Sequence, residues 1–282
     1  MFKPAGTVPI GIFDSGVGGL SVWKEAIKIL PGHNFIYFAD SAYSPYGPRS
    51  EEEIVERSEK ITEFFISQGV GMVIIACNTA TSAAIAPLRE RFAIPFIGME
   101  PAVKPAAALT KSGVIGVLAT KGTLSGRLYN RTLNLFASDV KVVEVVGTGL
   151  VPLVESGKTS GKEVEDLLEK YISPMVDMGA DYIVLGCTHY PFLRDAIQKI
   201  AGESVTLLDP APAVARHMYK VAKENKLIDP IGRDNILGVN LYKSCYMDTQ
   251  FFSSGSTAIL ERMARKVIPE IPDSCFKSKR LT

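Results

Sequence analysis

Two cysteines in this sequence lie in closely similar surroundings. Residues 72–79 and 182–189 each consist of an apolar run, a small residue, a cysteine and then polar side chains. Apolar runs of this length are typical of buried strands, so Cys77 and Cys187 are predicted at the ends of two equivalent strands. A thiolate on one side of a small molecule and a thiol on the other can remove a proton from one face and return one to the opposite face. The pair therefore indicates proton-transfer chemistry.

Polar residues also follow other predicted strands. Asp14 and Ser15 follow the first apolar run, Asp40 follows the second, and Thr79 and Thr188 follow the two cysteines. Ligands of open parallel sheets bind outside the carboxyl ends of the strands, so these side chains are expected to meet at one cleft. Helix starts beside them offer N–H groups that, with the three hydroxyls, would bind a carboxylate. The same helix ends are expected to lower a cysteine pKa toward the thiolate.

The cysteines also have other interpretations. A single cysteine at a strand end is most often a buried structural residue, but two at equivalent positions favour a shared site. A zinc site would need closely spaced cysteine or histidine pairs, and the sequence has none. Hydrolysis with Cys187 or Cys77 as nucleophile and His189 as base leaves the second thiol unexplained. The glycine-rich residues 14–19 are weak evidence for a phosphate site, because the Asp14 charge would repel a phosphate.

Strands and helices alternate along the chain, and the alternation restarts near residue 113. Strands are predicted at 8–13, 35–39, 72–76, 113–118, 142–146, 182–185 and 205–208. Helices are predicted at 16–30, 51–67, 79–92, 121–136, 161–178, 191–200, 212–225 and 256–267, with a hairpin around 237–252.

The repeated alternation predicts an α/β fold of two similar parallel-sheet domains. We expect the domains to be related by pseudo-twofold symmetry, with the active site in the cleft between them. Residues 1–98 and 210–282 would form the first domain, which carries Asp14 and Cys77. Residues 99–209 would form the second, which carries Cys187 and His189.

Composition narrows the class of ligand. The chain has 282 residues, and its hydrophobic fraction of 46% with 22% charged residues is typical of a globular protein. Lysine and arginine total 31 against 30 acidic residues, so no strong field favours nucleic acid or an anionic membrane, and a small ligand is expected. The four cysteines are widely spaced, and there is no signal-like start and no apolar run long enough to span a bilayer. Reduced thiols and a cytoplasmic location are therefore expected.

Four motifs together resemble those of the bacterial glutamate racemases. They are residues 13–20 (Phe-Asp-Ser-Gly-Val-Gly-Gly-Leu), 45–47 (Pro-Tyr-Gly), 76–80 (Ala-Cys-Asn-Thr-Ala) and 186–191 (Gly-Cys-Thr-His-Tyr-Pro). The match runs in order along essentially the whole chain. The resemblance implies interconversion of L- and D-glutamate for peptidoglycan synthesis, with neither pyridoxal phosphate nor metal as cofactor.

The resemblance also implies roles for individual residues. Cys77 and Cys187 would be the acid/base pair, with Asp14 near the first thiol and with His189 and Glu155 near the second. Substrate contacts would come from Asp14, Ser15, Tyr46, Gly47, Asn78, Thr79, Thr188 and His189.

Three further points stay open from the sequence. Racemisation of aspartate is the nearest alternative, and non-catalytic amino-acid binding and Cys–His hydrolysis are more distant ones. A homodimer is expected, because symmetric dimers are common among enzymes. The choice of glutamate as substrate rests on the resemblance.

Overall fold

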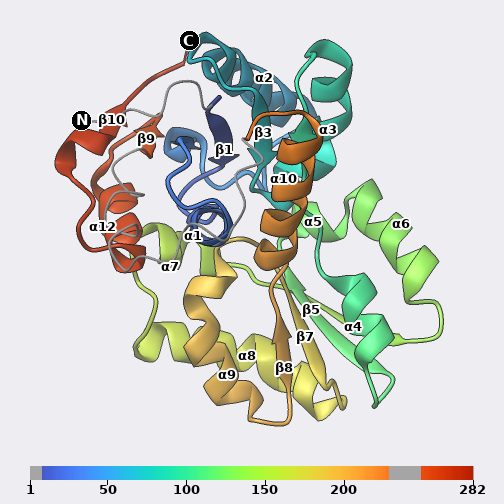
Figure 1. Ribbon diagram of the computed structural model, residues 1–282. Helices are drawn as coiled ribbons and strands as arrows, with labels where there is room; N and C mark the ends of the chain where they lie inside the picture. Colours follow the sequence, from blue (N-terminus) through green and yellow to red (C-terminus); the bar gives the residue numbers. More distant parts are fainter. Residues whose placement is uncertain (1–7, 229–248, 282) are drawn as a thin grey trace.

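The structure is a computed structural model that describes residues 8–228 and 249–281. It contains two β-sheets with helices packed around them (Figure 1). The first sheet has the strand order β10-β9-β2-β1-β3-β4, and the second has the order β6-β5-β7-β8. All neighbouring strands in both sheets run parallel.

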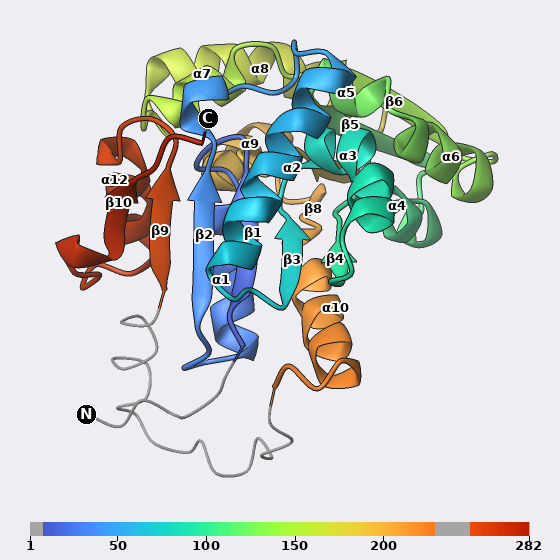
Figure 2. The same cartoon turned by 90° about the horizontal axis from the view of Figure 1, so that it is seen from above.

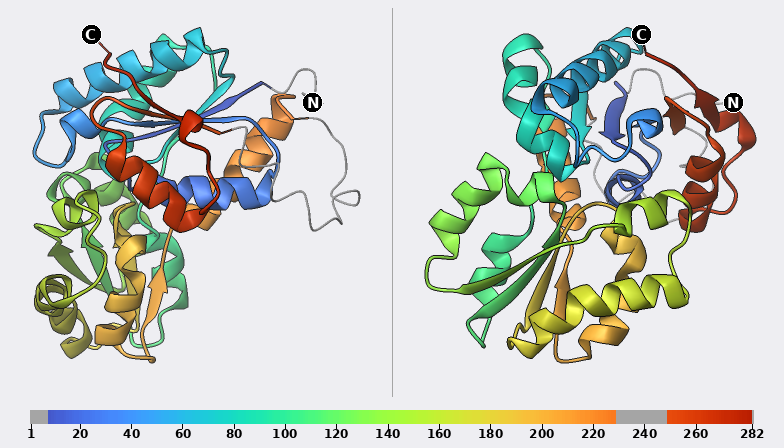
Figure 3. Two further views of the ribbon diagram at one scale, coloured as in Figure 1. Left: turned by 90° about the vertical axis from the view of Figure 1, so that its left-hand side faces the viewer. Right: turned by 180° about the vertical axis from the view of Figure 1, so that it is seen from behind.

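The strands of the first sheet are β1 (Ile10–Asp14), β2 (Phe35–Ala39), β3 (Met72–Ile75), β4 (Phe96–Ile97), β9 (Gln250–Ser253) and β10 (Phe276–Ser278). Those of the second are β5 (Val114–Ala119), β6 (Lys141–Val146), β7 (Tyr182–Gly186) and β8 (Thr206–Leu208). We call the part built on the first sheet the first lobe and the part built on the second sheet the second lobe. Figure 2 shows β9, β2, β1 and β3 side by side, and Figure 3 shows the second lobe lying against one side of the first.

Helices follow most strands. The α-helices are α1 (Leu20–Ile29), α2 (Glu51–Ser67), α3 (Asn78–Arg91), α4 (Val103–Leu109), α5 (Lys121–Leu124), α6 (Arg127–Phe136), α7 (Leu150–Glu155), α8 (Lys162–Asp177), α9 (Arg194–Ala201), α10 (Ala211–Glu224) and α12 (Ala258–Val267). Short 3₁₀ turns are η1 (Ser41–Tyr43), η2 (Tyr190–Leu193) and η4 (Asp273–Cys275).

The two lobes share one strand order. In both sheets the first four strands, counted along the chain, lie in the order second, first, third, fourth, and β9 and β10 extend only the first sheet. Cys77 follows β3 and Cys187 follows β7, which are the third strands of the two lobes. The predicted fold class of two similar parallel α/β units is confirmed, and it brings the two cysteines to equivalent strand ends.

Both faces of the first sheet are covered by packed side chains. Side chains alternate along β1: Ile10 and Ile12 belong to the same buried cluster as Trp23 of α1, whereas Phe13 packs with Phe65 of α2. All five residues of β1 are buried. Strands buried on both faces read as continuous apolar runs, which is why the sequence predicted this strand.

Some sequence predictions of elements are wrong. The helix predicted at 121–136 is two helices, α5 and α6, because the backbone of Gly126 between them is extended rather than helical. A Cβ on Gly126 would overlap the Ser82 hydroxyl of the other lobe. The helix predicted at 191–200 begins as the 3₁₀ turn η2, which carries a proline. Of the hairpin predicted around 237–252, residues 237–248 lie outside the described residues, and β9 pairs in parallel with both β2 and β10.

Candidate active site

Cys77 and Cys187 line one small cavity where the two lobes meet. Its volume is about 20 Å³, room for about one water molecule, and each thiol residue is 7% exposed. The cavity is also lined by seven other predicted site residues: Ser15, Tyr46, Gly47, Asn78, Thr79, Thr188 and His189. Asp14 and Glu155 stand behind this lining and contact residues within it.

Four lining residues were not among the predicted contacts, namely Pro45, Thr120, Thr123 and Val151. Thr120 follows β5 at the strand end that corresponds to Asp14 in the first lobe. The rule that polar residues at strand ends meet at a cleft would have found Thr120. No comparable signal marks Val151, which enters the cavity from helix α7.

Cys77 caps the N-terminus of helix α3. Its backbone is extended and its Sγ accepts a hydrogen bond from Ala80 N at 3.5 Å. Burial raises the pKa of the Cys77 thiol well above its ordinary value, the Asp14 charge raises it further, and the Ala80 N–H acts in the opposite direction. The expectation that the helix end lowers this pKa is therefore wrong, because desolvation outweighs one N–H donor. Cys77 rests as a neutral thiol.

Cys187 has a different electrostatic environment. Its Sγ lies 3.6 Å from His189 Nδ1, and His189 Nε2 lies 2.5 Å from Glu155 Oε1. Burial alone would lower the pKa of His189, but its hydrogen bonds to Cys187 and Glu155 and their charges raise this pKa well above its ordinary value. The raised pKa favours the protonated imidazole, whose Nδ1 faces Cys187 Sγ.

Asp14 joins the lobes from behind Cys77. Its carboxylate accepts hydrogen bonds from Ser15 N at 2.6 Å and from Thr188 Oγ1 at 2.9 Å. Burial raises the pKa of Asp14, while the His189 charge lowers it and the Glu155 charge raises it. Because the Thr188 hydroxyl donates its hydrogen bond to Asp14, it can act toward a ligand only as an acceptor.

Glu155 makes a second contact between the lobes. Its Oε1, which bonds His189, also accepts a hydrogen bond from Val17 N at 2.8 Å. On the same boundary, Ser21 Oγ donates to the Thr188 carbonyl at 3.2 Å. The cysteine cavity is thus closed by direct hydrogen bonds between the two lobes.

The glycine-rich loop after β1 serves this close approach. A Cβ on Gly16 would overlap the Glu155 carboxylate, and a Cβ on Gly18 would overlap the His189 ring. Neither glycine has a positive φ. The glycines are therefore required by contact with the second lobe rather than by backbone conformation.

A profile of the Asp/Glu/Hydantoin racemase family matches residues 21–218. The chain belongs to this family. The glutamate racemase of Herpetosiphon aurantiacus is 48% identical over 222 residues, which make up 79% of this chain and 87% of that protein. The glutamate racemase of Ralstonia pickettii is 50% identical over 210 residues, which make up 74% of each chain.

Solved structures resemble this racemase-family chain over nearly its whole length. Escherichia coli glutamate racemase, in complex with L-glutamate and the activator UDP-MurNAc-Ala, matches with a TM-score of 0.81 at 29% identity, covering 97% of this chain and 98% of that one. Francisella tularensis glutamate racemase in complex with D-glutamate matches with a TM-score of 0.78 at 28% identity, covering 98% of both chains.

Among the described residues, the amide of Asn78 in the cavity has free hydrogen-bonding groups. Asn78 is 5% exposed, and within the described part of the chain neither its Nδ2 nor its Oδ1 has a hydrogen-bond partner. Leaving a buried amide unpaired costs about 1–3 kcal/mol, which a bound polar ligand would recover. The first-turn N–H groups of α3, which begins at Asn78, also lack acceptors within their helix.

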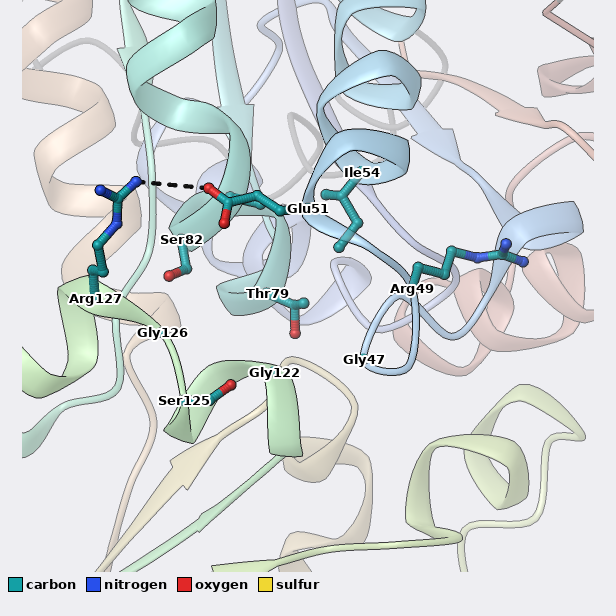
Figure 4. Close-up of a pocket in the computed structure, with 11 residues that line it drawn as sticks. Gly47, Arg49, Glu51, Ile54, Thr79, Ser82, Gly122, Ser125, Gly126 and Arg127 are labelled. Carbon is teal, nitrogen blue, oxygen red and sulfur yellow. Dashed lines mark ion pairs between the residues drawn. The ribbon is translucent and has the colours of Figure 1, made fainter.

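Larger pockets adjoin the cysteine cavity. One, of about 180 Å³, lies between α2 and α3 of the first lobe and α5 and α6 of the second, and it shares Gly47 and Thr79 with the cavity (Figure 4). At its edge Arg127 pairs with Glu51 at 3.7 Å. Another, of about 290 Å³, adjoins the cavity at Val151 among other residues. The two pockets leave space for a substrate to approach.

Within residues 8–228 and 249–281, neither a metal-binding cluster nor a membrane-spanning helix is present. No cluster of three or more histidine, cysteine, aspartate or glutamate side chains there is arranged to hold a metal ion. In the same ranges, no helix combines the length and the apolar character that crossing a membrane would require.

Proposed function

We propose that this protein is a glutamate racemase that exchanges the α-proton of glutamate between Cys77 and Cys187 without a cofactor, and that it supplies D-glutamate for peptidoglycan. The observation that carries the proposal is the pair of thiols, one from each lobe, in a single cavity with different charged neighbours. The substrate is supported by relatives named glutamate racemase and by the L-glutamate bound to the Escherichia coli enzyme.

The different neighbours of the two thiols suit one direction of the reaction. Cys187, which lies beside Nδ1 of the His189 ring, acts as the base, and Cys77, whose pKa is raised, supplies a proton to the opposite face. The other enantiomer requires the reverse protonation of the two thiols. Substrate held between them needs no reorientation during the transfer.

Acid–base chemistry alone contributes only about 10²–10⁴-fold, so the developing carbanion must also be stabilised. The Asn78 amide and the N–H groups of Asn78 and Thr79 in the first turn of α3 are donors suited to a carboxylate. Ala80 N, in contrast, already donates to Cys77 Sγ. The Thr188 hydroxyl, whose proton is donated to Asp14, is an acceptor suited to the ammonium group rather than to the carboxylate expected from the sequence.

Binding requires the cleft to open. A cavity of about 20 Å³ holds one water and not an amino acid. Opening would separate Asp14 from Thr188 and Glu155 from Val17, and closure over the substrate would restore these contacts and exclude water. In the closed form, Glu155 contacts both Val17 of the first lobe and His189 of the second. We therefore expect the charge on His189 to depend on closure of the cleft.

The chain Cys187–His189–Glu155 would also suit a cysteine nucleophile with its base and orienting carboxylate. Cys77 in the same cavity has no role in such hydrolysis, and membership of the racemase family favours proton transfer. The homodimer, the cytoplasmic location and the division at residues 98 and 210 stay predictions.

Incubating the purified protein with L-glutamate tests the proposal by circular dichroism. We expect the ellipticity to decay to zero, because the two enantiomers are equal in energy. Decay with L-aspartate alone would assign a different substrate, and thermal stabilisation by glutamate without decay would indicate a binding protein. Release of ammonia from an amide substrate without racemisation would indicate a hydrolase.

Alanine in place of Gly18 is expected to lower kcat/KM by roughly 10²-fold, the scale of losing a positioned charged donor. The added methyl group would enter the space of the His189 ring and the Asp14 carboxylate. Gly69→Ala is the control for a general loss of stability. A side chain at Gly69 would strain the backbone, because φ is positive there, but it would meet no other atoms. Racemisation assays on both variants check this, and an unchanged rate in Gly18→Ala would show that the lobes need not approach so closely.

A further inference from the structure

A buried ion pair lies beneath the loop that carries Tyr46. Arg57 of α2 donates from Nε to Asp40 Oδ2 at 3.0 Å and from Nη2 to Asp40 Oδ1 at 2.9 Å. The two side chains are 4% and 0% exposed. Neither lines the cysteine cavity, so the expectation that the Asp40 side chain meets the other strand-end residues at the cleft is wrong. The sequence alone indicated no role for Arg57.

Tyr46 connects this pair to the cavity. Its hydroxyl donates to Asp40 Oδ2 at 2.6 Å, and the residue is 1% exposed. Burial and the Asp40 charge raise the pKa of Tyr46, so the hydroxyl stays protonated and keeps this bond. Pro45, Tyr46 and Gly47 all line the cavity. Because the hydroxyl donates its hydrogen bond to Asp40, we expect Tyr46 to contact the substrate through its ring and backbone.

Arg57 has two further contacts that fix its position. Its guanidinium carbon lies 3.9 Å from the centre of the Tyr43 ring, and Nη1 donates to the Leu281 carbonyl at 3.1 Å. One planar group thus joins the end of β2, helix α2, turn η1 and residues near the end of the chain. A lysine offers neither the planar fork nor the stacking face, so it cannot replace these contacts.

We propose that Arg57 is a positioning residue for substrate binding: it holds Asp40 as the acceptor for Tyr46 and thereby fixes residues 45–47 against the cavity. The inference rests on the proposed function. Neither Arg57 nor Asp40 reaches the thiols, so the pair acts on affinity rather than on proton transfer. Loss of binding that is equal in the ground and transition states raises KM and leaves kcat unchanged.

The test compares Arg57→Lys, Tyr46→Phe and the double variant in racemisation kinetics. Arg57→Lys is expected to raise KM for glutamate roughly 10-fold, with kcat within about 2-fold of wild type. Tyr46→Phe is expected to raise KM by a smaller factor. The double variant should bind no worse than Arg57→Lys alone, because both substitutions break one chain of contacts. The pH profile of kcat should not move.

Arg91→Gln is the matched control. It removes a guanidinium that pairs with Glu59 and Glu63 of the same helix α2 on the protein surface. We expect its KM to equal that of wild type. A lowered melting temperature with unchanged KM in Arg57→Lys, or additive effects in the double variant, would overturn the inference. If the wild type itself does not racemise glutamate, the proposed function fails, and the same comparison made on the glutamate Kd by calorimetry still decides the role of Arg57.

Discussion

Serine in place of either Cys77 or Cys187 is expected to lower racemisation roughly 10²–10⁴-fold, the range lost when an acid/base group is removed. A serine hydroxyl is a far weaker acid than a thiol. The remaining cysteine cannot replace the missing thiol, because it faces the opposite side of the substrate. Because the enantiomers are equal in energy, kcat/KM must fall by the same factor in both directions. Progress curves started from L- and from D-glutamate measure both factors.

The control for the cysteine variants is Cys275→Ser. Cys275 is also buried, at 7% exposed, but it belongs to turn η4 and not to the cavity. Its substitution should leave kcat/KM unchanged even if stability falls. A Cys77→Ser or Cys187→Ser protein that keeps the wild-type rate would remove that thiol from the mechanism.

Glutamine in place of His189 is expected to lower kcat/KM roughly 10²-fold near neutral pH, as for loss of a preorganised electrostatic group. The wild-type imidazolium stands 3.6 Å from Cys187 Sγ, and glutamine carries no charge there. Because the pKa of His189 is raised, the wild-type rate should hold well above pH 6.5 and fall as the pH rises through the raised pKa. The variant should lack that dependence.

The pH dependence of the melting temperature is an independent test of the charge on His189. A histidine whose pKa is raised on folding stabilises the protein fully below its unfolded pKa of about 6.5, and this contribution is lost as the pH rises through the folded pKa. The melting temperature of wild type should therefore exceed that of His189→Gln most at low pH. His217→Gln, on the exposed side of α10, is the control. Identical pH profiles for wild type and His189→Gln would contradict a charged His189.

The parts of the site that lie at strand ends could be predicted from the sequence. Apolar runs buried on both faces marked the strands, and the residues after them, such as Cys77 and Cys187, fell at one edge because the strands are parallel. Strand β2 and helix α2 have the predicted bounds. In α2, Ser50 as N-cap and three acidic residues in the first turn gave a strong local signal for its start.

The contacts between the lobes could not be predicted. Glu155 and Val17 are 138 positions apart, and helix α7, which carries Glu155, has only six residues and gives no periodic pattern. The roles of Gly16 and Gly18 follow from that contact and not from any turn. From the sequence, Arg57 is an ordinary charged residue of a helix. Its pairing with Asp40 depends on how α2 packs over the sheet, which the sequence does not indicate.

The reaction of L-glutamate in D₂O tests the account most directly. At early times, NMR would measure deuterium at the α-carbon separately in the remaining L-glutamate and in the D-glutamate formed. Two thiols on opposite faces predict that the new D-glutamate carries solvent deuterium while the remaining L-glutamate keeps its proton. D-Glutamate that retains the original proton, or L-glutamate that exchanges as fast as D-glutamate forms, would contradict transfer between Cys77 and Cys187.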